Sequence, residues 1–354
     1  MKYLKNLFTI IKKTVADRGF ILTISVYIIK LIYKIIWPIA NLAFLAFFSV
    51  KNNRLLFESN GDFSDNGRAL FEYMIKKGYN KRYEIVWLVE EPHKYKKHVT
   101  QNVRFVKKIN SLCNCRSLKF LYYACTSKFI FITHSMNWLL MKKKSQTLVN
   151  LWHGCGYKAA KGNSEKIKFD YCLVPGTVFV DTKKEFFMCS EDKLLPLGYP
   201  RYDYFRNENT NVLNFIREYC HNNKTVLWMP TYRKSKSLSL SENTLGNKEI
   251  DLPIIDKFED LKYVDNFCNR NKIFLLIKRH RLQLEYKVDD SKYSNIAFMD
   301  DDILSQHDFQ LYELLTYVDA LITDYSSVAI DFLLLDKPIG FTLDDFDRYK
   351  ESRG

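Results

Sequence analysis

His153 is a residue of this chain whose type and position suggest catalytic chemistry. It lies in Trp152-His153-Gly154, directly after a run of apolar residues that predicts a strand. A histidine there can act as a general base, because its pKa lies near neutral pH. A glycine at the next position lets the main chain turn sharply and approach a ligand closely. The alternative is an ordinary capped turn that contains an incidental histidine.

A second candidate is the stretch Asp319–Pro338, which predicts a strand, a tight turn and a helix. The turn, Asp324-Tyr325-Ser326-Ser327, is rich in residue types that cap helices. The following run, Val328–Leu335, is apolar apart from Asp331 and suits a largely buried helix. Main-chain N–H groups at a helix N-terminus bind phosphate. An ordinary strand-to-helix junction with a good cap fits these residues equally well.

Two more polar clusters end predicted strands. Pro230-Thr231-Tyr232-Arg233 supplies hydroxyls and a cation, and Lys278-Arg279-His280-Arg281 places basic side chains in succession. Such a basic run repels itself unless an anion lies beside it, and a phosphate group would be that anion. A solvated basic loop is the alternative. Asp300-Asp301-Asp302 could suggest a metal site, but consecutive acidic residues on a turn are usually only solvated.

The charge of the chain indicates an acidic partner. Its 354 residues carry a formal net charge of +14, with a sequence pI near 9.2. This charge favours nucleic acid, an anionic membrane or a phosphorylated substrate. The sequence contains no zinc finger or RNP-like strand, so we expect no nucleic acid partner. The eight cysteines form no C-x-x-C pair, which favours buried thiols in a reducing compartment over disulfides or a zinc site.

Residues 1–50 predict a membrane-associating helical segment. Residues 1–19 are basic and amphipathic, and residues 20–50 are strongly apolar despite Lys34 and Pro38. We expect a helical hairpin or a pair of interfacial helices on the cytoplasmic leaflet, with lysines against anionic lipid. A transmembrane span is the second alternative, because the apolar run nearly reaches the roughly 20 residues that a span needs. A buried pair of helices in a soluble protein is the third.

After residue 50, strand-like and helix-like segments alternate. Apolar runs at residues 83–89 and 273–277, for example, predict strands. Repeated strand–helix–strand units predict an α/β fold with parallel sheets, which bind ligands at the carboxyl ends of their strands. We expect two Rossmann-like, doubly wound domains facing a cleft, one spanning residues 51–205 and the other residues 206–354. The polar stretch 235–249 lacks apolar periodicity and predicts a loop or a mobile lid.

An ordered set of motifs resembles the CDP-glycerol glycerophosphotransferase family of teichoic acid polymerases and primases. The motifs are LWHGCGYKAAKG (151–162), LGYPRYD (197–203), WMPTYR (228–233), IKRHR (277–281) and ITDYSSVAIDFLLLDKPIGFTLDDFDRY (322–349). The resemblance covers about residues 130–354 and implies a GT-B type fold. Family members commonly continue Trp-His-Gly with Thr-Pro-Leu-Lys, whereas this chain has Cys155-Gly156-Tyr157-Lys158. They usually continue beyond the last motif with further helices, so we expect the 206–354 domain to be incomplete at its C-terminus.

The resemblance also assigns roles to individual residues. It implies that His153 and His280 are the catalytic histidines, and we assign Gly154 and Lys158 to the acceptor or its phosphate. Arg201 could also face the cleft. The donor-binding set is Thr231, Arg233, Arg279, Ser326, Ser327 and Asp331. We expect no cofactor and no tightly bound metal, because cations and main-chain amides can stabilise charge on phosphates.

The reaction expected from the resemblance is transfer of a polyol phosphate. A hydroxyl of a lipid-linked polyol-phosphate acceptor would attack the β-phosphorus of CDP-glycerol or CDP-ribitol, His153 would remove the hydroxyl proton, and CMP would leave. The expected location is the cytoplasmic face of the cell membrane, on an anionic surface. One alternative is a GT-B glycosyltransferase that uses a nucleotide sugar. Another is a catalytically inactive scaffold attached to the membrane.

Overall fold

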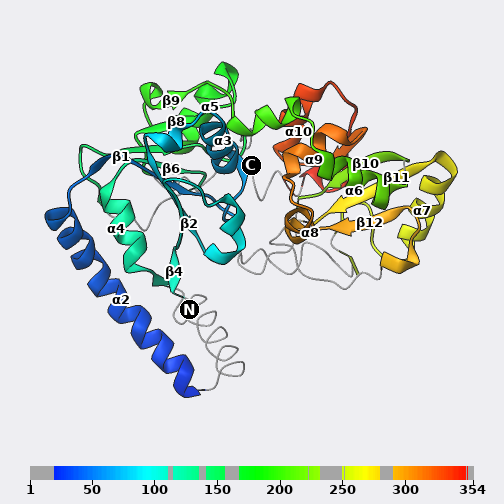
Figure 1. The fold of residues 1–354 in the computed structure, drawn as a ribbon. Coiled ribbons are helices and arrows are strands. Elements are labelled where there is room, and N and C mark those ends of the chain that lie inside the picture. The colour runs from blue at the N-terminus through cyan, green and yellow to red at the C-terminus, as the bar shows by residue number, and fades with distance from the viewer. Residues whose placement is uncertain are drawn as a thin grey trace. The chain divides into compact units, whose positions relative to one another are not determined.

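The computed structural model describes residues 20–110, 115–134, 141–155, 167–221, 223–231, 249–250, 252–279, 290–347 and 349. Its contacts group the chain into two compact units (Figure 1). The first holds Met1–Trp152 and Ile167–Leu173, and the second holds His153–Lys166 and Val174–Gly354. Each is an α/β unit built on a parallel sheet, as the sequence predicts. The division into an acceptor domain at 51–205 and a donor domain at 206–354 stays a prediction.

The sheet of the first unit consists of parallel strands, and its central strands β1 (Lys51–Glu58) and β2 (Glu84–Val89) contain runs of buried apolar residues. The strands lie in the order β3 (Val103–Lys107), β2, β1, β6 (Ser127–Ile132), β7 (Thr147–Asn150) and β8 (Tyr171–Leu173). Helix α3 (Asp65–Lys76) packs Phe71 and Met74 against Phe57 and Trp87. Helix α4 (Leu118–Thr126) contacts β1, β3 and β6. Helices on a parallel sheet explain why strands such as β2 are continuously apolar.

Helix α2 (Phe20–Phe47) precedes this sheet and packs on α4. Trp37 and Asn41, which lie one helical turn apart, are buried, and the Asn41 amide donates to Cys125 Sγ (3.4 Å). Most of the apolar stretch 20–50 therefore forms one helix, and Pro38 does not end it. Residues 1–19 of the expected hairpin lie outside the described residues. In the part of the chain that the structure describes, no helix has both the length and the apolar character for crossing a membrane.

Short elements complete the first unit. They are the 3-10 turns η1 (Tyr79–Lys81) and η2 (Pro92–His98) and the antiparallel pair β4 (Ile109–Asn110) and β5 (Cys115–Arg116).

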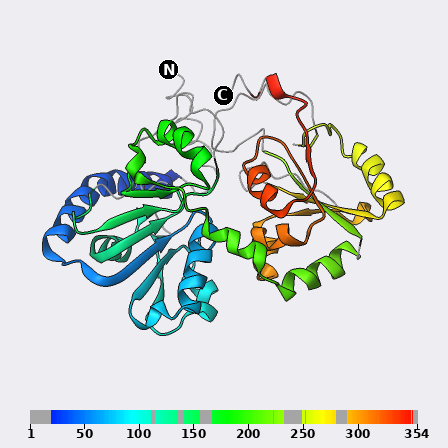
Figure 2. The ribbon, with the colours of Figure 1, turned by 90° about the horizontal axis from the view of Figure 1, so that it is seen from above.

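The second unit contains a parallel sheet with helices on both faces. Its strands lie in the order β12 (Ile296–Met299), β11 (Ile273–Lys278), β10 (Lys224–Met229), β13 (Ala320–Thr323) and β14 (Ile339–Phe341). Figure 2 shows α7 (Asp260–Asn271, yellow) and α6 (Thr210–Cys220, green) on opposite sides of this sheet. The core beneath α7 includes Leu261, Cys268, Trp228 and Leu275.

The strand order of the second unit reverses between β10 and β13. The chain moves outward from β10 to β11 and β12, and then returns to place β13 on the other side of β10. A parallel sheet binds its ligands beside such a reversal, at the carboxyl ends of the strands. Met229 pairs with Thr323 at this point, and both lead directly into predicted site residues.

The second unit also includes other described elements. They are η3 (Thr177–Phe179), α5 (Val180–Phe187), η4 (Glu191–Lys193), β9 (Leu194–Leu195), η5 (Pro200–Arg206), η7 (Asp290–Lys292), α8 (Asp301–Gln306), α9 (Leu311–Tyr317), α10 (Val328–Phe332) and η8 (Leu333–Leu335).

Three local predictions have specific outcomes. The predicted helix over Val328–Leu335 is confirmed, although its last turn tightens into η8. The predicted acidic turn at Asp300–Asp302 instead begins α8, because Asp300 accepts hydrogen bonds from the N–H groups of Asp302 and Ile303. The predicted lid, residues 235–249, lies outside the described residues except for its last residue, Glu249.

Candidate active site

The turn before His153, in the first unit, contains a residue with an unusual main-chain conformation. Trp152 has a φ of 52°, in the left-handed region that costs a residue with a side chain about 1 kcal/mol. The Trp152 N–H donates to Asn150 Oδ1 (2.9 Å). The buried Asn66 amide donates to the carbonyls of Leu151 (3.1 Å) and Trp152 (2.9 Å). These hydrogen bonds fix the direction in which the chain leaves β7.

In the second unit, the residues after this turn lie against the start of α10. A Cβ built on Gly154 would be 2.6 Å from Ser327 Oγ, and Cys155 Sγ lies 3.7 Å from the Ser327 carbonyl oxygen. Glycine is therefore needed at 154 for this close approach. The structure thus brings together two motifs that the sequence analysis could treat only separately, the His153 turn and the Ser326-Ser327 turn.

Three side chains hold the carbonyl groups of the His153 turn. Arg201 Nη1 donates to the His153 carbonyl (2.9 Å). The Gly154 carbonyl accepts from Tyr199 OH (2.8 Å) and from Lys183 Nζ (3.1 Å). Lys183 lies on α5 and is only 1% exposed. The main chain beside the predicted catalytic histidine is therefore fixed by buried donors.

Arg201 is in turn fixed by Asp331 of α10. Arg201 Nη2 lies 2.7 Å from Asp331 Oδ2, and the two side chains are 4% and 0% exposed. Tyr202 OH donates to Asp331 Oδ1 (2.5 Å), and Tyr312 OH donates to Oδ2. Burial, followed by the nearby Asp331 charge, raises the pKa of Tyr202, so this hydroxyl keeps its proton. The Arg201 guanidinium also lies over the Tyr312 ring, 4.2 Å from its centroid.

The ends of β10 and β13 are joined through Thr231 and Asp324. Thr231 Oγ1 donates to Asp324 Oδ1 (2.5 Å), and the Thr231 N–H lies 3.0 and 2.9 Å from the two carboxylate oxygens. The Tyr325 N–H also donates to Asp324 Oδ1 (2.6 Å). Asp324 is only 2% exposed, so it serves as a buried acceptor that shapes the turn before Ser326.

The basic cluster after β11 has acidic partners within the chain. Lys278 Nζ lies 2.7 Å from Asp301 Oδ1, and Arg279 Nη2 lies 3.5 Å from Asp300 Oδ2. This arrangement arises because β11 and β12 are parallel neighbours, with Lys278 in register with Met299. The sequence predicts a phosphate group as the anion beside this cluster. The structure shows that Asp300 and Asp301 already offset part of this charge.

The predicted site residues divide into those that the structure describes and those outside it. Arg233, His280 and Lys158 lie outside the described residues. Among the described residues, Gly154 lies against Ser327. Ser326 precedes Ser327 in the same turn, and Asp331 follows on α10. Thr231 and Arg279 follow the neighbouring strands β10 and β11. The catalytic and donor-binding roles of all these residues stay predictions.

Sequence reasoning missed Asn66, Lys183 and Tyr199 as supports of the His153 turn. Each is polar at a position that the structure buries. A polar residue within an otherwise apolar helix face, as at Asn66 in α3, is a signal that could have been found. The partners of Lys183 and Tyr199 are carbonyl groups, which leave no trace in the sequence.

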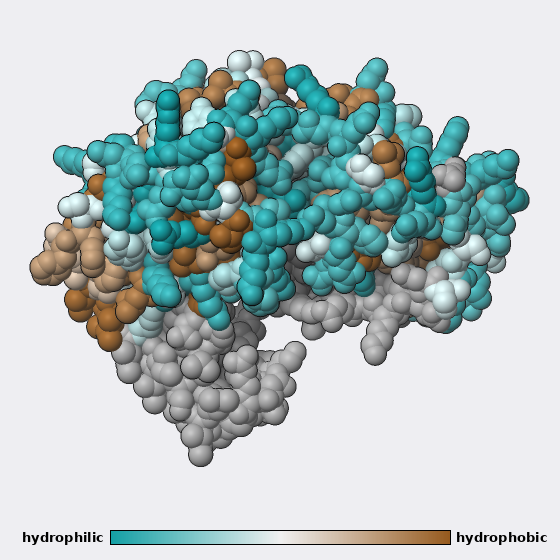
Figure 3. Space-filling model, viewed as in Figure 1, coloured by the Kyte–Doolittle hydropathy of each residue, from teal (hydrophilic) through white to brown (hydrophobic). Residues whose placement is uncertain are grey.

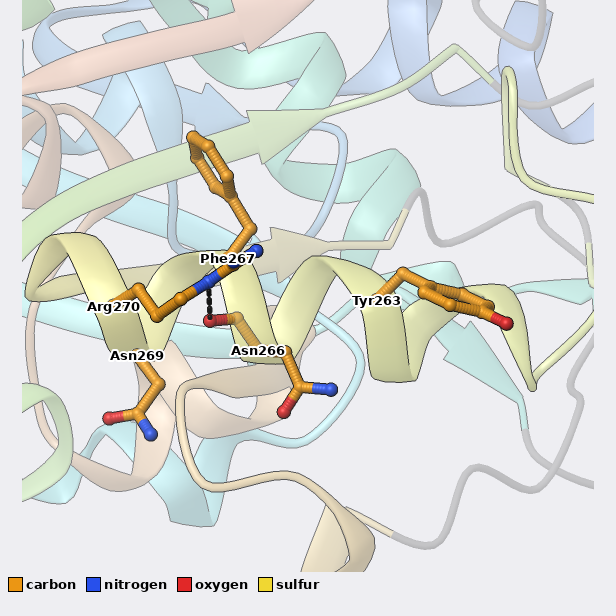
Figure 4. A pocket seen from close by; sticks show the side chains of 5 residues that line it. All are labelled: Tyr263, Asn266, Phe267, Asn269 and Arg270. Atoms are coloured by element: carbon orange, nitrogen blue, oxygen red, sulfur yellow. Dashed lines mark hydrogen bonds between the residues drawn. The ribbon is translucent and has the colours of Figure 1, made fainter.

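A surface pocket on α7 lies apart from these residues. Tyr263, Asn266, Phe267, Asn269 and Arg270 line it, and Arg270 Nε donates to the Asn266 carbonyl (3.3 Å) (Figure 4). Tyr263 and Phe267 are largely exposed. None of the predicted site residues that the structure describes lines this pocket, so we do not assign the reaction to it.

Comparison with known families decides what this chain is related to. Residues 40–354 match the model of the family described as CDP-Glycerol:Poly(glycerophosphate) glycerophosphotransferase. This chain belongs to that family. The predicted resemblance and the predicted class of enzyme, a glycerophosphotransferase, are therefore confirmed.

The names of curated relatives of this glycerophosphotransferase refer to teichoic acid. It is 26% identical to a teichoic acid poly(glycerol phosphate) polymerase of Bacillus spizizenii, over 91% of this chain and 80% of the relative. It is 26% identical to a teichoic acid glycerol-phosphate transferase of Staphylococcus aureus, over 85% of this chain and 77% of the relative. It spans only 42% of a Staphylococcus epidermidis poly(glycerol phosphate) polymerase, to which it is 27% identical.

A solved structure supports the fold of this glycerophosphotransferase. The wall teichoic acid polymerase TagF, in a histidine-to-alanine variant, matches with a TM-score of 0.66 and 25% identity, over 85% of this chain and 72% of TagF. The predicted GT-B-like α/β fold with parallel sheets is confirmed by this match. The cleft between two domains and the membrane-associating segment stay predictions.

Proposed function

We propose that this glycerophosphotransferase moves glycerol phosphate from CDP-glycerol to a membrane-linked acceptor in teichoic acid synthesis and releases CMP. One structural observation supports the proposal in addition to family membership. The His153 turn and the Ser326-Ser327 turn lie against each other in one unit, so closely that a Cβ on Gly154 would lie 2.6 Å from Ser327 Oγ. A general base and a hydroxyl-rich phosphate site are then neighbours, as a phosphoryl transfer requires.

In the proposed reaction, an acceptor hydroxyl oxygen forms a bond to the β-phosphorus of CDP-glycerol. The bond between that phosphorus and the oxygen that bridges to the CMP phosphate breaks, and CMP leaves with the electron pair. His153 takes the proton of the acceptor hydroxyl. The hydrogen bond from Arg201 to the His153 carbonyl (2.9 Å) holds the main chain from which the imidazole acts.

The donor would lie at the carboxyl ends of β10, β11 and β13. Thr231, Ser326 and Ser327 supply hydroxyls there, and Arg279 supplies a cation. Such groups stabilise charge as it develops on transferring phosphates. The proposal also includes three residues on the basis of the sequence alone. The resemblance assigns Arg233 and His280 to the same task, and Lys158 is assigned to the acceptor.

We also propose that the enzyme is located at the cytoplasmic face of the cell membrane. Ile35, Ile39 and Leu42 lie on one face of α2 and are 63%, 62% and 52% exposed. Brown and tan side chains at the left edge of Figure 3 mark this apolar surface along α2. An amphipathic helix whose apolar face is exposed binds at a membrane interface. The net charge of +14 favours anionic lipid.

The test is release of CMP by the purified full chain in detergent. CDP-glycerol and CDP-ribitol are offered in parallel, each with and without a lipid-linked glycerol-phosphate acceptor. We expect release only with acceptor, and a decrease of about 10²- to 10⁴-fold in His153→Ala. His93→Ala is the matched control, because the His93 side chain is 67% exposed and only pairs with Glu91. Undiminished release by His153→Ala would remove the histidine from this role.

Two further arms of the same assay address the alternatives. Turnover of a nucleotide sugar, without CMP release from either CDP-polyol, would favour a glycosyltransferase. Binding of acceptor by folded protein, without release from any donor, would favour an inactive scaffold. Preference for CDP-ribitol over CDP-glycerol would keep the reaction class and change the polyol.

A further inference from the structure

We propose that Asp331 is a positioning residue, which acts on His153 through Arg201 rather than by binding the donor itself. This inference rests on the proposed function, in which His153 is the general base. It differs from the role that the family resemblance suggests, since the resemblance places Asp331 in the donor pocket.

The contacts of Asp331 carry the argument. Its side chain is 0% exposed, and both carboxylate oxygens accept hydrogen bonds from side chains of this chain. Tyr202 OH donates to Oδ1 (2.5 Å), while Arg201 Nη2 (2.7 Å) and Tyr312 OH donate to Oδ2. A carboxylate that is buried among three donors has the environment of a structural anchor for the cation beside it.

Arg201 connects this anchor to the catalytic turn. Its planar guanidinium offers several donors in a fixed fork. One of these, Nη2, contacts Asp331, and another, Nη1, donates to the His153 carbonyl (2.9 Å). The two contacts therefore use one rigid group, and a shift of the guanidinium changes both. The position of the His153 main chain is coupled to Asp331 through this group.

Electrostatics explains why the pair acts as a unit. Breaking a buried ion pair by removing one partner leaves an uncompensated charge, and that charge is strongly unfavourable in a buried site. Arg201, with a side chain only 4% exposed, would then turn toward water or another anion. The His153 carbonyl would lose its donor in the process. A displacement of about 1 Å in a catalytic group can lower turnover by about 100-fold.

A positioning role and a donor-binding role predict different kinetics. Loss of a donor-binding carboxylate raises KM for CDP-glycerol. Loss of a positioning residue lowers kcat and leaves that KM nearly unchanged, because the donor contacts remain. The ring titration of His153, measured by NMR on histidine-labelled protein without substrate, should also change only if Asp331 acts on this histidine.

The experiment compares Asp331→Asn and Arg201→Lys with the unaltered full chain. We expect Asp331→Asn to lower kcat by about 100-fold, with KM for CDP-glycerol within about threefold. Arg201→Lys should give an intermediate loss, since a lysine keeps the charge but lacks the fork that reaches both partners. If Asp331→Asn fails to fold, Arg201→Lys carries the test, because it retains a cation beside Asp331.

Glu84→Gln is the matched control for loss of a buried ion pair. Arg54 Nε and Glu84 Oε2 lie 2.8 Å apart in the first unit, with side chains 3% and 17% exposed, and neither contacts the His153 turn. We expect Glu84→Gln to lower stability without lowering kcat. Equal losses of kcat in Glu84→Gln and Asp331→Asn would overturn the proposal, as would a raised KM with unchanged kcat in Asp331→Asn.

The same measurements separate failure of this inference from failure of the proposed function. Absence of CMP release by the unaltered chain, or full activity of His153→Ala, would refute the proposed function. A changed His153 titration in Asp331→Asn would still support the positioning contact. An unchanged titration, in an enzyme that depends on His153 and keeps its kcat in Asp331→Asn, would refute the positioning role alone.

Discussion

Gly154 lies so close to Ser327 that a Cβ on the glycine would be 2.6 Å from the serine Oγ and 3.4 Å from its Cβ. Only the first of these distances is shorter than real Cβ contacts allow. The hydroxyl of Ser327, rather than the main chain of α10, is therefore what requires glycine at position 154. This relationship can be tested without any knowledge of the reaction.

We expect Gly154→Ala to lower the free energy of unfolding by about 1–3 kcal/mol, because an added methyl group forces a close contact. Ser327→Ala alone should cost less. The double variant should recover about 1 kcal/mol or more of the loss, since the remaining 3.4 Å distance is an ordinary contact. Denaturant unfolding of the four proteins measures the coupling. Simple additivity of the two losses would contradict this account of the contact.

Thr231→Val should lower the free energy of unfolding by about 2 kcal/mol, because it removes a donor from the buried Asp324 carboxylate. Valine has nearly the shape of threonine, so the packing changes little. Thr231→Ser is the control, since it keeps the hydroxyl, and it should remain close to the unaltered protein. Thermal or denaturant unfolding distinguishes them. An equal loss in both variants would mean that the methyl group, not the hydrogen bond, matters.

The buried carboxyl group of Glu58 should make the stability of the protein depend on pH in a specific way. Burial raises the pKa of this carboxyl above its ordinary value of 4.5, despite Arg116 Nη1 at 2.8 Å. Folding then favours the protonated form, so Glu58 stabilises below about pH 4.5 and loses this contribution as pH rises through its raised pKa. Glu58→Gln should therefore gain stability relative to the unaltered protein as pH rises above 4.5.

A second glutamate gives the control of opposite sign. A hydrogen bond from Lys94 lowers the pKa of the exposed Glu91, so its contribution is present at neutral pH and is lost as pH falls. Relative to the unaltered protein, Glu91→Gln should lose stability slightly as pH rises. Urea unfolding from pH 4 to 7 measures both variants. The same trend in both would show that the effect reflects net charge rather than the surroundings of Glu58.

Replacement of Ile39 and Leu42 by serine should weaken binding to anionic phospholipid vesicles by roughly 10- to 30-fold. This estimate assigns about 1 kcal/mol to each apolar side chain that enters the interface. Val178→Ser with Leu197→Ser is the matched control, because these side chains are 82% and 77% exposed in the second unit. Vesicle flotation provides the measurement. Equal binding by both double variants would exclude α2 as the membrane-binding face.

Local signals account for what the sequence could predict. The apolar run before Asp324 and the capping residues after it predict a strand, a turn and a helix, and β13 and α10 are found there. The motifs from His153 onward identify the family because their order and residue types are specific. The parallel sheets follow from the alternation of strands and helices.

The contacts between distant residues could not be predicted in the same way. Arg201 and Asp331 are 130 positions apart, and nothing in either motif names the other as its partner. Likewise, Asp300 and Asp301 are local acids in the sequence, and they meet Lys278 and Arg279 only because β12 lies beside β11. Pairing of this kind is decided by packing, which a single sequence does not display.

The exposed apolar face of α2 has a consequence for how the enzyme would meet its acceptor. If α2 lies in a membrane interface, enzyme and lipid-linked acceptor share one plane, and their encounter becomes a search in two dimensions. The effective concentration of acceptor is then set by its surface density rather than by its amount in the cell volume. Ile35, Ile39 and Leu42 would thus influence turnover by setting how often the acceptor arrives, without touching it.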